Sequence, residues 1–169
     1  WENAAACLRR FYASSWLARA RELRAGEWLP IDEIDSFLLE GVKVFAGPDF
    51  AFRDAGSTVL VDWKTGRPRE EDKEQVKGYA LFAAAKWSAT PEQVVARLVY
   101  LGSGEEVDVN VAPDALEHFR EFFRGSVAQM KQLLRDPARN VAAREDFQPT
   151  EDPSRCRGCS FQRLCGRAG

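Results

Sequence analysis

Histidine and long apolar runs are what this sequence has least of. Its one histidine, His118, is isolated from other metal-ligating or catalytic residue types, so we predict a surface or packing role for it. No apolar run reaches the roughly 18 residues that a membrane-spanning helix needs, and no signal-like segment is visible in a chain that begins at Trp1. Internal repeats and low-complexity tracts are also absent. We therefore expect a cytoplasmic globular protein that does not engage a membrane.

The composition is that of one folded domain. The chain has 169 residues, of which 45% are hydrophobic, and this is enough to bury a sizeable core. We predict a single domain over residues 1–169, with a core at about 35–135 and two terminal regions at 1–25 and 153–169.

The net charge is only −2, but it is unevenly distributed. Residues 1–25 carry five arginines against two acids, and residues 153–169 carry four arginines and no acid. Basic ends that are brought together would present one positive surface to a nucleic acid. The alternative is that these arginines are ordinary solvated residues. The candidates for nucleic-acid contact are Arg9, Arg10, Arg155 and Arg157.

Two apolar runs in the first half of the chain predict a β-hairpin. They cover residues 44–50 and 58–66, and between them lies the turn-forming segment 53–57. Side chains alternate between the two faces of a strand, so Asp62 and Lys64 should share one face.

The polar residues on that face indicate a metal site. Val61 and Trp63 should point the opposite way, and burying a carboxylate and an ammonium in an apolar strand is costly unless something compensates. With Asp49 on the neighbouring strand, Asp62 and Lys64 could hold a hard divalent cation and place the lysine beside the attacking water. The alternative is a plain ion pair between Asp62 and Lys64 on a solvated face.

A helix is predicted after the hairpin, over residues 70–87. Gln75 and Tyr79 are four residues apart on it and therefore share a face. The chain thus shows, in order, a glycine-preceded aspartate at Asp49, a hairpin, the D-W-K-T-G sequence of residues 62–66, and a helix with Q-x-x-x-Y. In this order and spacing, the motifs resemble those of the PD-(D/E)XK nuclease superfamily, specifically its RecB-like branch.

The resemblance implies an active site made of Asp49, Asp62, Lys64, Gln75 and Tyr79. The two aspartates, with the carbonyl of Trp63 as a further ligand, would bind Mg²⁺ or Mn²⁺. The lysine would orient or help to deprotonate the attacking water and stabilise the transition state. The glutamine and the tyrosine would position the lysine and the nucleic-acid backbone.

Four cysteines stand at the two ends of the chain: Cys7, and then Cys156, Cys159 and Cys165. This spacing suits a tetrathiolate metal site better than two disulfides, and zinc and an iron–sulfur cluster both accept four thiolates. The segment C-L-R-R-F-Y at residues 7–12 resembles the opening of the iron–sulfur subgroup of RecB-like nucleases, which includes AddB and the CRISPR adaptation nucleases. The resemblance implies a [4Fe–4S] cluster that clasps the two ends together.

One element of the RecB-like pattern has no clear counterpart. That group usually carries a metal-binding histidine or acid upstream of the first strand. Residues 8–48 contain no histidine, and the acids considered for this role are Glu22, Glu33 and Glu40. The number of catalytic metals is therefore left open.

The fold class implied is α/β: a restriction-endonuclease-like core with a mixed sheet of about five strands flanked by helices. We expect a first helix over residues 4–24 and a first core strand over 37–46. Strands at 94–101 and 106–111 should form a second hairpin with one central and one edge strand. A helix from Pro113 to about Arg135 should pack an apolar stripe on the core.

Together these features predict a metal-dependent nuclease that hydrolyses DNA on single strands or at ends, as an exonuclease rather than an endonuclease. Its partners would be DNA and proteins of a repair, recombination or defence complex. Two alternatives stay open: a non-catalytic, nuclease-derived module that binds DNA or a protein, and an unrelated cysteine-rich zinc protein. The enzyme is favoured because all five polar residues of the expected active site are present at the expected spacing.

Overall fold

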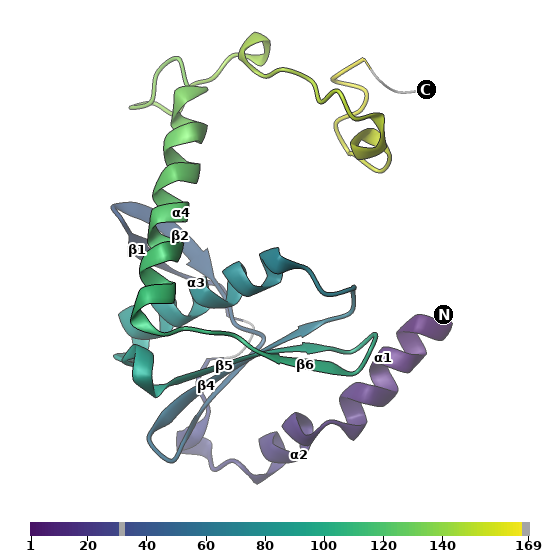
Figure 1. The fold of residues 1–169 in the computed structure, drawn as a ribbon, viewed down its shortest axis with the longest axis vertical. Helices are drawn as coiled ribbons and strands as arrows, with labels where there is room; N and C mark the ends of the chain where they lie inside the picture. The colour runs from purple at the N-terminus through teal and green to yellow at the C-terminus, as the bar shows by residue number, and fades with distance from the viewer. Residues whose placement is uncertain (31–32, 167–169) are drawn as a thin grey trace. The chain divides into compact units, whose positions relative to one another are not determined.

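The computed structural model describes residues 1–30 and 33–166, and the chain divides into two compact units, Trp1–Phe123 and Arg124–Gly169 (Figure 1). No helix in the described ranges is long and apolar enough to cross a membrane.

The first unit is built on a four-stranded mixed sheet in the order β3–β4–β5–β6 (Figure 1). Strands β3 (Phe50–Asp54) and β4 (Ser57–Lys64) form the predicted hairpin across a tight turn. Strand β5 (Val94–Tyr100) runs parallel to β4, and β6 (Glu105–Asp108) returns antiparallel at the edge. The predicted pair of a central and an edge strand is therefore confirmed.

Helices cover both faces of this sheet (Figure 1). Helix α3 (Glu70–Trp87) packs on one face and has the predicted bounds. Helices α1 (Glu2–Ala13) and α2 (Ser15–Glu22) pack on the other face. Each face has its own apolar cluster, so the sheet is the middle of three layers.

Strand β4 alternates between these two clusters. Leu60 packs in the cluster under α3, whereas Val61 packs in the cluster under α1 and α2. Asp62 and Lys64 follow the parity of Leu60, and Trp63 packs against the cluster of Val61. The two charged residues therefore share the α3 face, as the alternation predicts.

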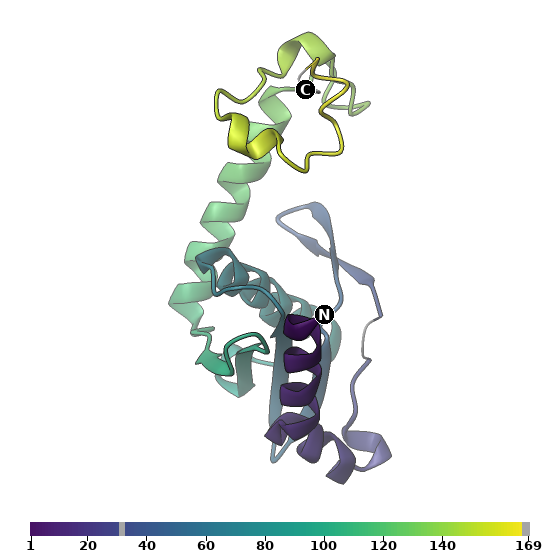
Figure 2. The same cartoon turned by 90° about the vertical axis from the view of Figure 1, so that its right-hand side faces the viewer.

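The prediction of one core strand over residues 37–46 is wrong. This segment forms a separate two-stranded sheet of β1 (Asp35–Leu39) and β2 (Val42–Ala46), which stands apart from the main sheet (Figure 2). Glu40 and Gly41 turn the chain with φ angles of 51° and 74°. Two successive residues with positive φ make a tight hairpin turn, whereas a bulge would have let the strand continue. The main sheet therefore has four strands, and the prediction of about five is corrected.

The prediction of one helix over residues 4–24 is also wrong. Ser14 has an extended backbone, and its hydroxyl accepts the N–H of Leu17 at 3.2 Å. It therefore ends α1 and caps α2, a role for which serine is well suited.

Helix α4 (Pro113–Gln132) carries the predicted apolar stripe, and the part of the stripe in the first unit packs on the core. Leu116 is buried, and Phe119 and Phe123 pack against the cluster under α3. Met130, which belongs to the second unit, is exposed.

The second unit consists of the rest of α4 and a chain with short 3₁₀ turns at Arg144–Asp146 and Pro153–Cys156. Arg135 holds part of it together, because its Nε atom donates to Asp146 Oδ2 at 2.7 Å. All the polar groups proposed for catalysis lie in the first unit.

Candidate active site

Asp49 lies at the mouth of the β3–β4 hairpin. It occupies the bend just before Phe50, and Phe50 pairs with Val61 in the antiparallel ladder. Its Oδ2 atom accepts the backbone N–H of Trp63 at 2.9 Å. The structure thus brings Asp49 beside Asp62, across one step of the ladder.

Asp62 is almost completely buried, with 2% of its surface exposed. The Nζ atom of Lys64 lies 2.7 Å from its Oδ2 atom. The Lys64 ammonium is thus an ion-pair partner of this oxygen, and Oδ2 accepts no other hydrogen bond among the described residues. Burial raises the pKa of Asp62 above its usual range, and the charge of Asp49 adds to this, although Lys64 opposes it.

These two carboxylates fit a hard divalent cation. Mg²⁺ and Mn²⁺ prefer oxygen ligands, and a buried carboxylate beside a second carboxylate is a place where a cation would relieve the unfavourable negative charge. In the described ranges no group of three or more His, Cys, Asp or Glu side chains is arranged to hold a metal. The side-chain ligands offered here are therefore the two aspartates.

A chain of hydrogen bonds runs from Lys64 to helix α3. Lys64 Nζ donates to Gln75 Oε1 at 2.6 Å, and Gln75 Nε2 donates to the Tyr79 hydroxyl at 2.6 Å. Burial, together with the charges of Asp62 and Asp49, raises the pKa of Tyr79 to about 12. The tyrosine therefore stays neutral at ordinary pH and holds the glutamine, which in turn holds the lysine.

Asp72 and Tyr100 form a buried polar pair near this site, and sequence reasoning missed both. The Tyr100 hydroxyl donates to Asp72 Oδ2 at 3.0 Å, and the same oxygen accepts the backbone N–H of Arg69 at 3.2 Å. Tyr100 is the ladder neighbour of Lys64. The pair fixes the start of α3 against β5, and the only sequence signal for it was an acid in the first turn of the helix.

The side chain of Trp63 belongs to the opposite face of the sheet. Its ring stacks on Phe50 at 5.5 Å between centroids and meets Phe11 edge-on at 5.2 Å. This packing anchors the strand from behind. Only the backbone carbonyl of Trp63, and not its side chain, could therefore contact a metal held by Asp49 and Asp62.

Of the three upstream acids considered, one lies beside the segment that leads into Asp49. Glu22 and Glu40 are paired with arginines. The backbone of Glu33 lies against Gly47, where an added Cβ would be 3.2 Å from the Glu33 carbonyl oxygen. Since Gly47 leads into Asp49, this close approach of two backbones helps to set the position of the aspartate.

The four arginines predicted to contact nucleic acid differ in their surroundings. Arg9 and Arg157 are exposed. Arg10 donates from Nη1 to the carbonyls of residues 101 and 102, at 2.9 and 2.6 Å, and so fastens α1 to the β5–β6 turn. Arg155 lies 3.8 Å from an aspartate oxygen in its own turn. The nucleic-acid role of all four stays a prediction.

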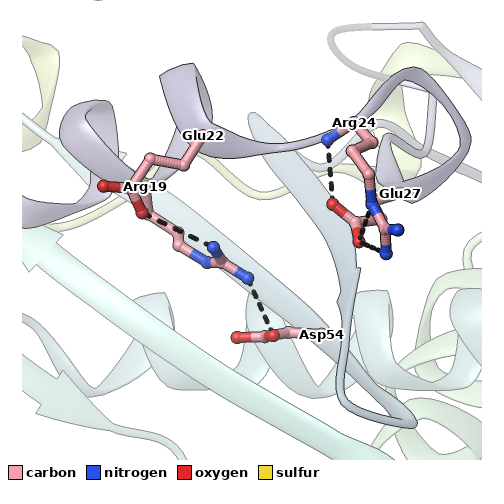
Figure 3. Close-up of polar contacts among 5 residues, drawn as sticks. All are labelled: Arg19, Glu22, Arg24, Glu27 and Asp54. Atoms are coloured by element: carbon pink, nitrogen blue, oxygen red, sulfur yellow. Dashed lines mark hydrogen bonds and ion pairs between the residues drawn. The ribbon is translucent and has the colours of Figure 1, made fainter.

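Other arginines of the amino-terminal region are engaged with acids (Figure 3). Arg19 reaches from α2 to Asp54 at the end of β3, with Nη2 2.8 Å from Oδ1, and also lies 3.5 Å from Glu22. Arg24 pairs with Glu27 through two nitrogens. The surplus of positive charge counted in this region is therefore partly neutralised locally.

The cysteines are free thiols in the structure. Cys7 is buried in the apolar cluster under α1 and α2 of the first unit, whereas Cys156, Cys159 and Cys165 belong to the second unit. The three have no metal-binding arrangement among themselves in the described ranges. The cysteine clasp between the two ends is not shown, and it stays a prediction.

Comparison with known families agrees with the motifs and the fold. A model of the PD-(D/E)XK nuclease superfamily matches residues 1–166. The match includes the hairpin, the two aspartates, the lysine and helix α3, but it does not distinguish the RecB-like iron–sulfur subgroup, which stays a prediction. A comparison with curated proteins found no significant match. The chain belongs to the PD-(D/E)XK nuclease superfamily.

Proposed function

We propose that this protein is a divalent-metal-dependent nuclease that hydrolyses phosphodiester bonds of DNA. The superfamily to which the chain belongs implies a nucleic-acid substrate, and a divalent metal is typical of it. The observation that carries the proposal is Asp62, a buried carboxylate that is paired with the Lys64 ammonium and lies beside a second carboxylate, Asp49. Such an arrangement is unfavourable for folding alone and becomes useful once a cation is bound.

Asp49, Asp62 and the carbonyl of Trp63 would hold Mg²⁺ or Mn²⁺. When bound, the metal supplies positive charge that offsets the negative charge of the phosphate during attack. The Asp49 carboxylate is already oriented for metal binding, because its Oδ2 atom accepts the backbone N–H of Trp63. Asp49 is therefore held by a hydrogen bond from the backbone, and Asp62 is held by burial.

Lys64 is the residue that would act on the reacting groups. Its ammonium lies between Asp62 and Gln75, at 2.7 and 2.6 Å. From there it can orient the attacking water and stabilise negative charge as it develops on the phosphate oxygens. Gln75 and the neutral Tyr79 hold it in place, so no reorganisation of the lysine is needed when the substrate reacts.

The finer specificity proposed is exonuclease action on single-stranded DNA or on ends, and it is supported by the resemblance to RecB-like enzymes. The test compares linear single strands, circular single strands, duplex DNA and RNA of one sequence, each with Mg²⁺ or Mn²⁺. An exonuclease degrades the linear strand and spares the circle. Cleavage of the circular strand would show an endonuclease, and preferential cleavage of RNA would show that the substrate is RNA rather than DNA.

Matched variants make the assay specific to the site. Asp62→Asn and Lys64→Met should abolish cleavage, whereas Glu121→Gln and Lys131→Met, which change exposed residues of α4, should not. If the purified wild-type protein binds DNA but cleaves none of the substrates with either metal, the non-catalytic module is the correct reading.

A [4Fe–4S] cluster held by Cys7, Cys156, Cys159 and Cys165 is the second part of the proposal. Its support is the C-x-R-R-F-Y segment and the C-x-x-C turn of residues 156–159, after which the Phe161 N–H donates to Cys159 Sγ at 3.4 Å. Hydrogen bonds to cysteine sulfur are a feature of such sites. Anaerobically purified protein should be brown and contain iron. Colourless protein with stoichiometric zinc would favour the zinc site, and colourless protein without metal would favour free or disulfide-linked thiols.

A further inference from the structure

Three segments that are far apart in the sequence meet at one end of the main sheet (Figure 1). They are the residues that follow β4, the turn that joins β5 to β6, and the first turn of α1. Because β4 and β5 are parallel, both strands end here, and the carbonyl of Lys64 accepts the N–H of Leu101 at 2.7 Å. This end of the sheet is therefore the one that carries the proposed catalytic lysine.

Backbone contacts hold these segments close together. A Cβ added to Gly102 would lie 3.1 Å from the carbonyl oxygen of Thr65, so a larger residue would push the two segments apart. Arg10 of α1 donates to the carbonyls of Leu101 and Gly102 and so holds the turn against the helix. The arrangement of the three segments is therefore fixed before any ligand binds.

A hollow of about 430 Å³ lies among these segments. Its described lining contains no aromatic and no acidic side chain, so it offers a base no stacking surface and an anion no repelling carboxylate. Within that lining Arg67 alone is charged. The lining residues are Asn3, Thr65, Gly66, Arg67, Pro68, Gly102 and Ser103.

The polar side chains of the hollow can all donate hydrogen bonds to a ligand. Arg67 is exposed and, within the described ranges, has no acidic partner. The Ser103 hydroxyl accepts the N–H of Glu105 at 3.2 Å, which leaves its own hydrogen available. Asn3 and Thr65 are exposed and add an amide and a hydroxyl. A guanidinium with neutral donors around it is well suited to a phosphate.

We propose that this hollow binds a phosphate of a DNA strand close to the phosphate that is cleaved, and that Arg67 makes the main contact. The Cα atoms of Lys64 and Arg67 are at most about 11 Å apart, and a strand of a DNA helix advances about 3.4 Å per phosphate. The bound phosphate is therefore within about three nucleotides of the cleaved one. Such a contact fixes the position of the strand without reading its sequence. The inference rests on the proposed nuclease function and deepens it, because it assigns the placement of the strand to a named residue.

The test measures binding in EDTA, so that it does not depend on cleavage. The full chain is titrated into a fluorescein-labelled single-stranded oligonucleotide at several salt concentrations, and fluorescence anisotropy gives the Kd. Arg67→Met should weaken binding by about 3- to 10-fold at low salt. It should also reduce the slope of log Kd against log salt by about 0.7, the value for one phosphate of a single strand. Arg67→Lys keeps the charge and should keep the slope.

Two further changes control the result. Arg21→Met removes an exposed arginine of α2 that does not line the hollow, and it should leave the Kd and the slope nearly unchanged. The double variant Asn3→Ala with Ser103→Ala removes two neutral donors, so it should weaken binding by about 2- to 10-fold without changing the slope.

Oligonucleotides with and without a terminal phosphate distinguish the two sources of the bound group. An effect of Arg67→Met that is confined to phosphorylated ends assigns the hollow to the end of a strand. An equal effect on both oligonucleotides assigns it to an internal phosphate.

The outcomes separate this inference from the proposed function. If the wild type cleaves DNA and Arg67→Met binds with the affinity and slope of the wild type, the phosphate site is wrong and the nuclease stands. If no form cleaves but the slope falls for Arg67→Met alone, the phosphate site stands and catalysis is wrong. If Arg21→Met reduces the slope as much as Arg67→Met, or if the double variant binds like the wild type, Arg67 acts only as one more surface charge and the inference is overturned.

Discussion

Replacing Asp62 by asparagine should make the metal-free protein more stable while it removes activity. Asp62 is 2% exposed, and among the described residues its Oδ2 atom is paired with the Lys64 ammonium and accepts no other hydrogen bond. Its pKa is raised mainly by burial, which means that the folded state disfavours the ionised form. Stability that is present when Asp62 is protonated is therefore lost as the pH rises through its folded-state pKa. Asparagine has nearly the same shape and no charge, so it avoids this loss.

The size of the effect follows from the cost of a buried polar group that is incompletely compensated, about 1–3 kcal/mol. Asparagine recovers only part of this, since it also forgoes the ion pair with Lys64. We expect a gain of about 1 kcal/mol, or about 2–4 °C in Tm for a chain of this size. The gain should be present at neutral pH and should shrink in acid, where Asp62 of the wild type takes up its proton.

Metal should reverse the order of the two proteins. A ligand at about 100 times its Kd stabilises the folded state by about 2.7 kcal/mol, which corresponds to about 5–10 °C in Tm. Mg²⁺ or Mn²⁺ should therefore raise the Tm of the wild type and not that of Asp62→Asn. The assay is thermal unfolding followed by circular dichroism, with and without metal, and Glu121→Gln serves as the surface control.

Two patterns of melting temperature would contradict this prediction. If Asp62→Asn melts below the wild type in EDTA, the carboxylate stabilises the fold, and its main role is the ion pair with Lys64. If metal raises the Tm of both proteins equally, the cation binds elsewhere.

Three other substitutions test the surroundings of the site. Gln75→Ala should lower kcat by about 10- to 100-fold, as is usual for a residue that positions another, with little change in KM; a rise in KM alone would place Gln75 on the substrate rather than on Lys64. Tyr100→Phe removes a hydrogen bond to Asp72 and should cost about 1–3 kcal/mol in urea unfolding; an unchanged midpoint would show that the pair does not hold α3. Gly47→Ala places a methyl group 3.2 Å from a backbone carbonyl and should reduce cleavage more than it reduces Tm; full activity would show that the loop before the first aspartate tolerates displacement.

Parts of the site were predictable because they depend on local periodicity. The alternation of β4 placed Asp62 and Lys64 on one face whatever the rest of the chain does, and spacing by four placed Gln75 and Tyr79 together on α3. A helix bounded by Gly66 and Pro68 on one side has little freedom to begin elsewhere.

Other features were hidden because several local conformations were equally compatible with the sequence. Ser14 lies in a segment rich in helix formers, and only its capping bond to Leu17 shows that the helix is broken there. The Glu40–Gly41 pair suits a bulge as well as a turn. The contact between Asp72 and Tyr100 joins residues 28 positions apart, and nothing in either segment specifies its partner.

The most direct test of the central claim is the initial rate of cleavage of labelled single-stranded DNA by the wild type and by Lys64→Met, with Mg²⁺ or Mn²⁺ and in EDTA. Both proteins must first be shown to be folded. We expect metal-dependent cleavage by the wild type and a rate at least about 100-fold lower for the variant, the effect of removing a charge-stabilising group. Equal rates for the two proteins, or cleavage by the wild type that persists in EDTA, would contradict this expectation.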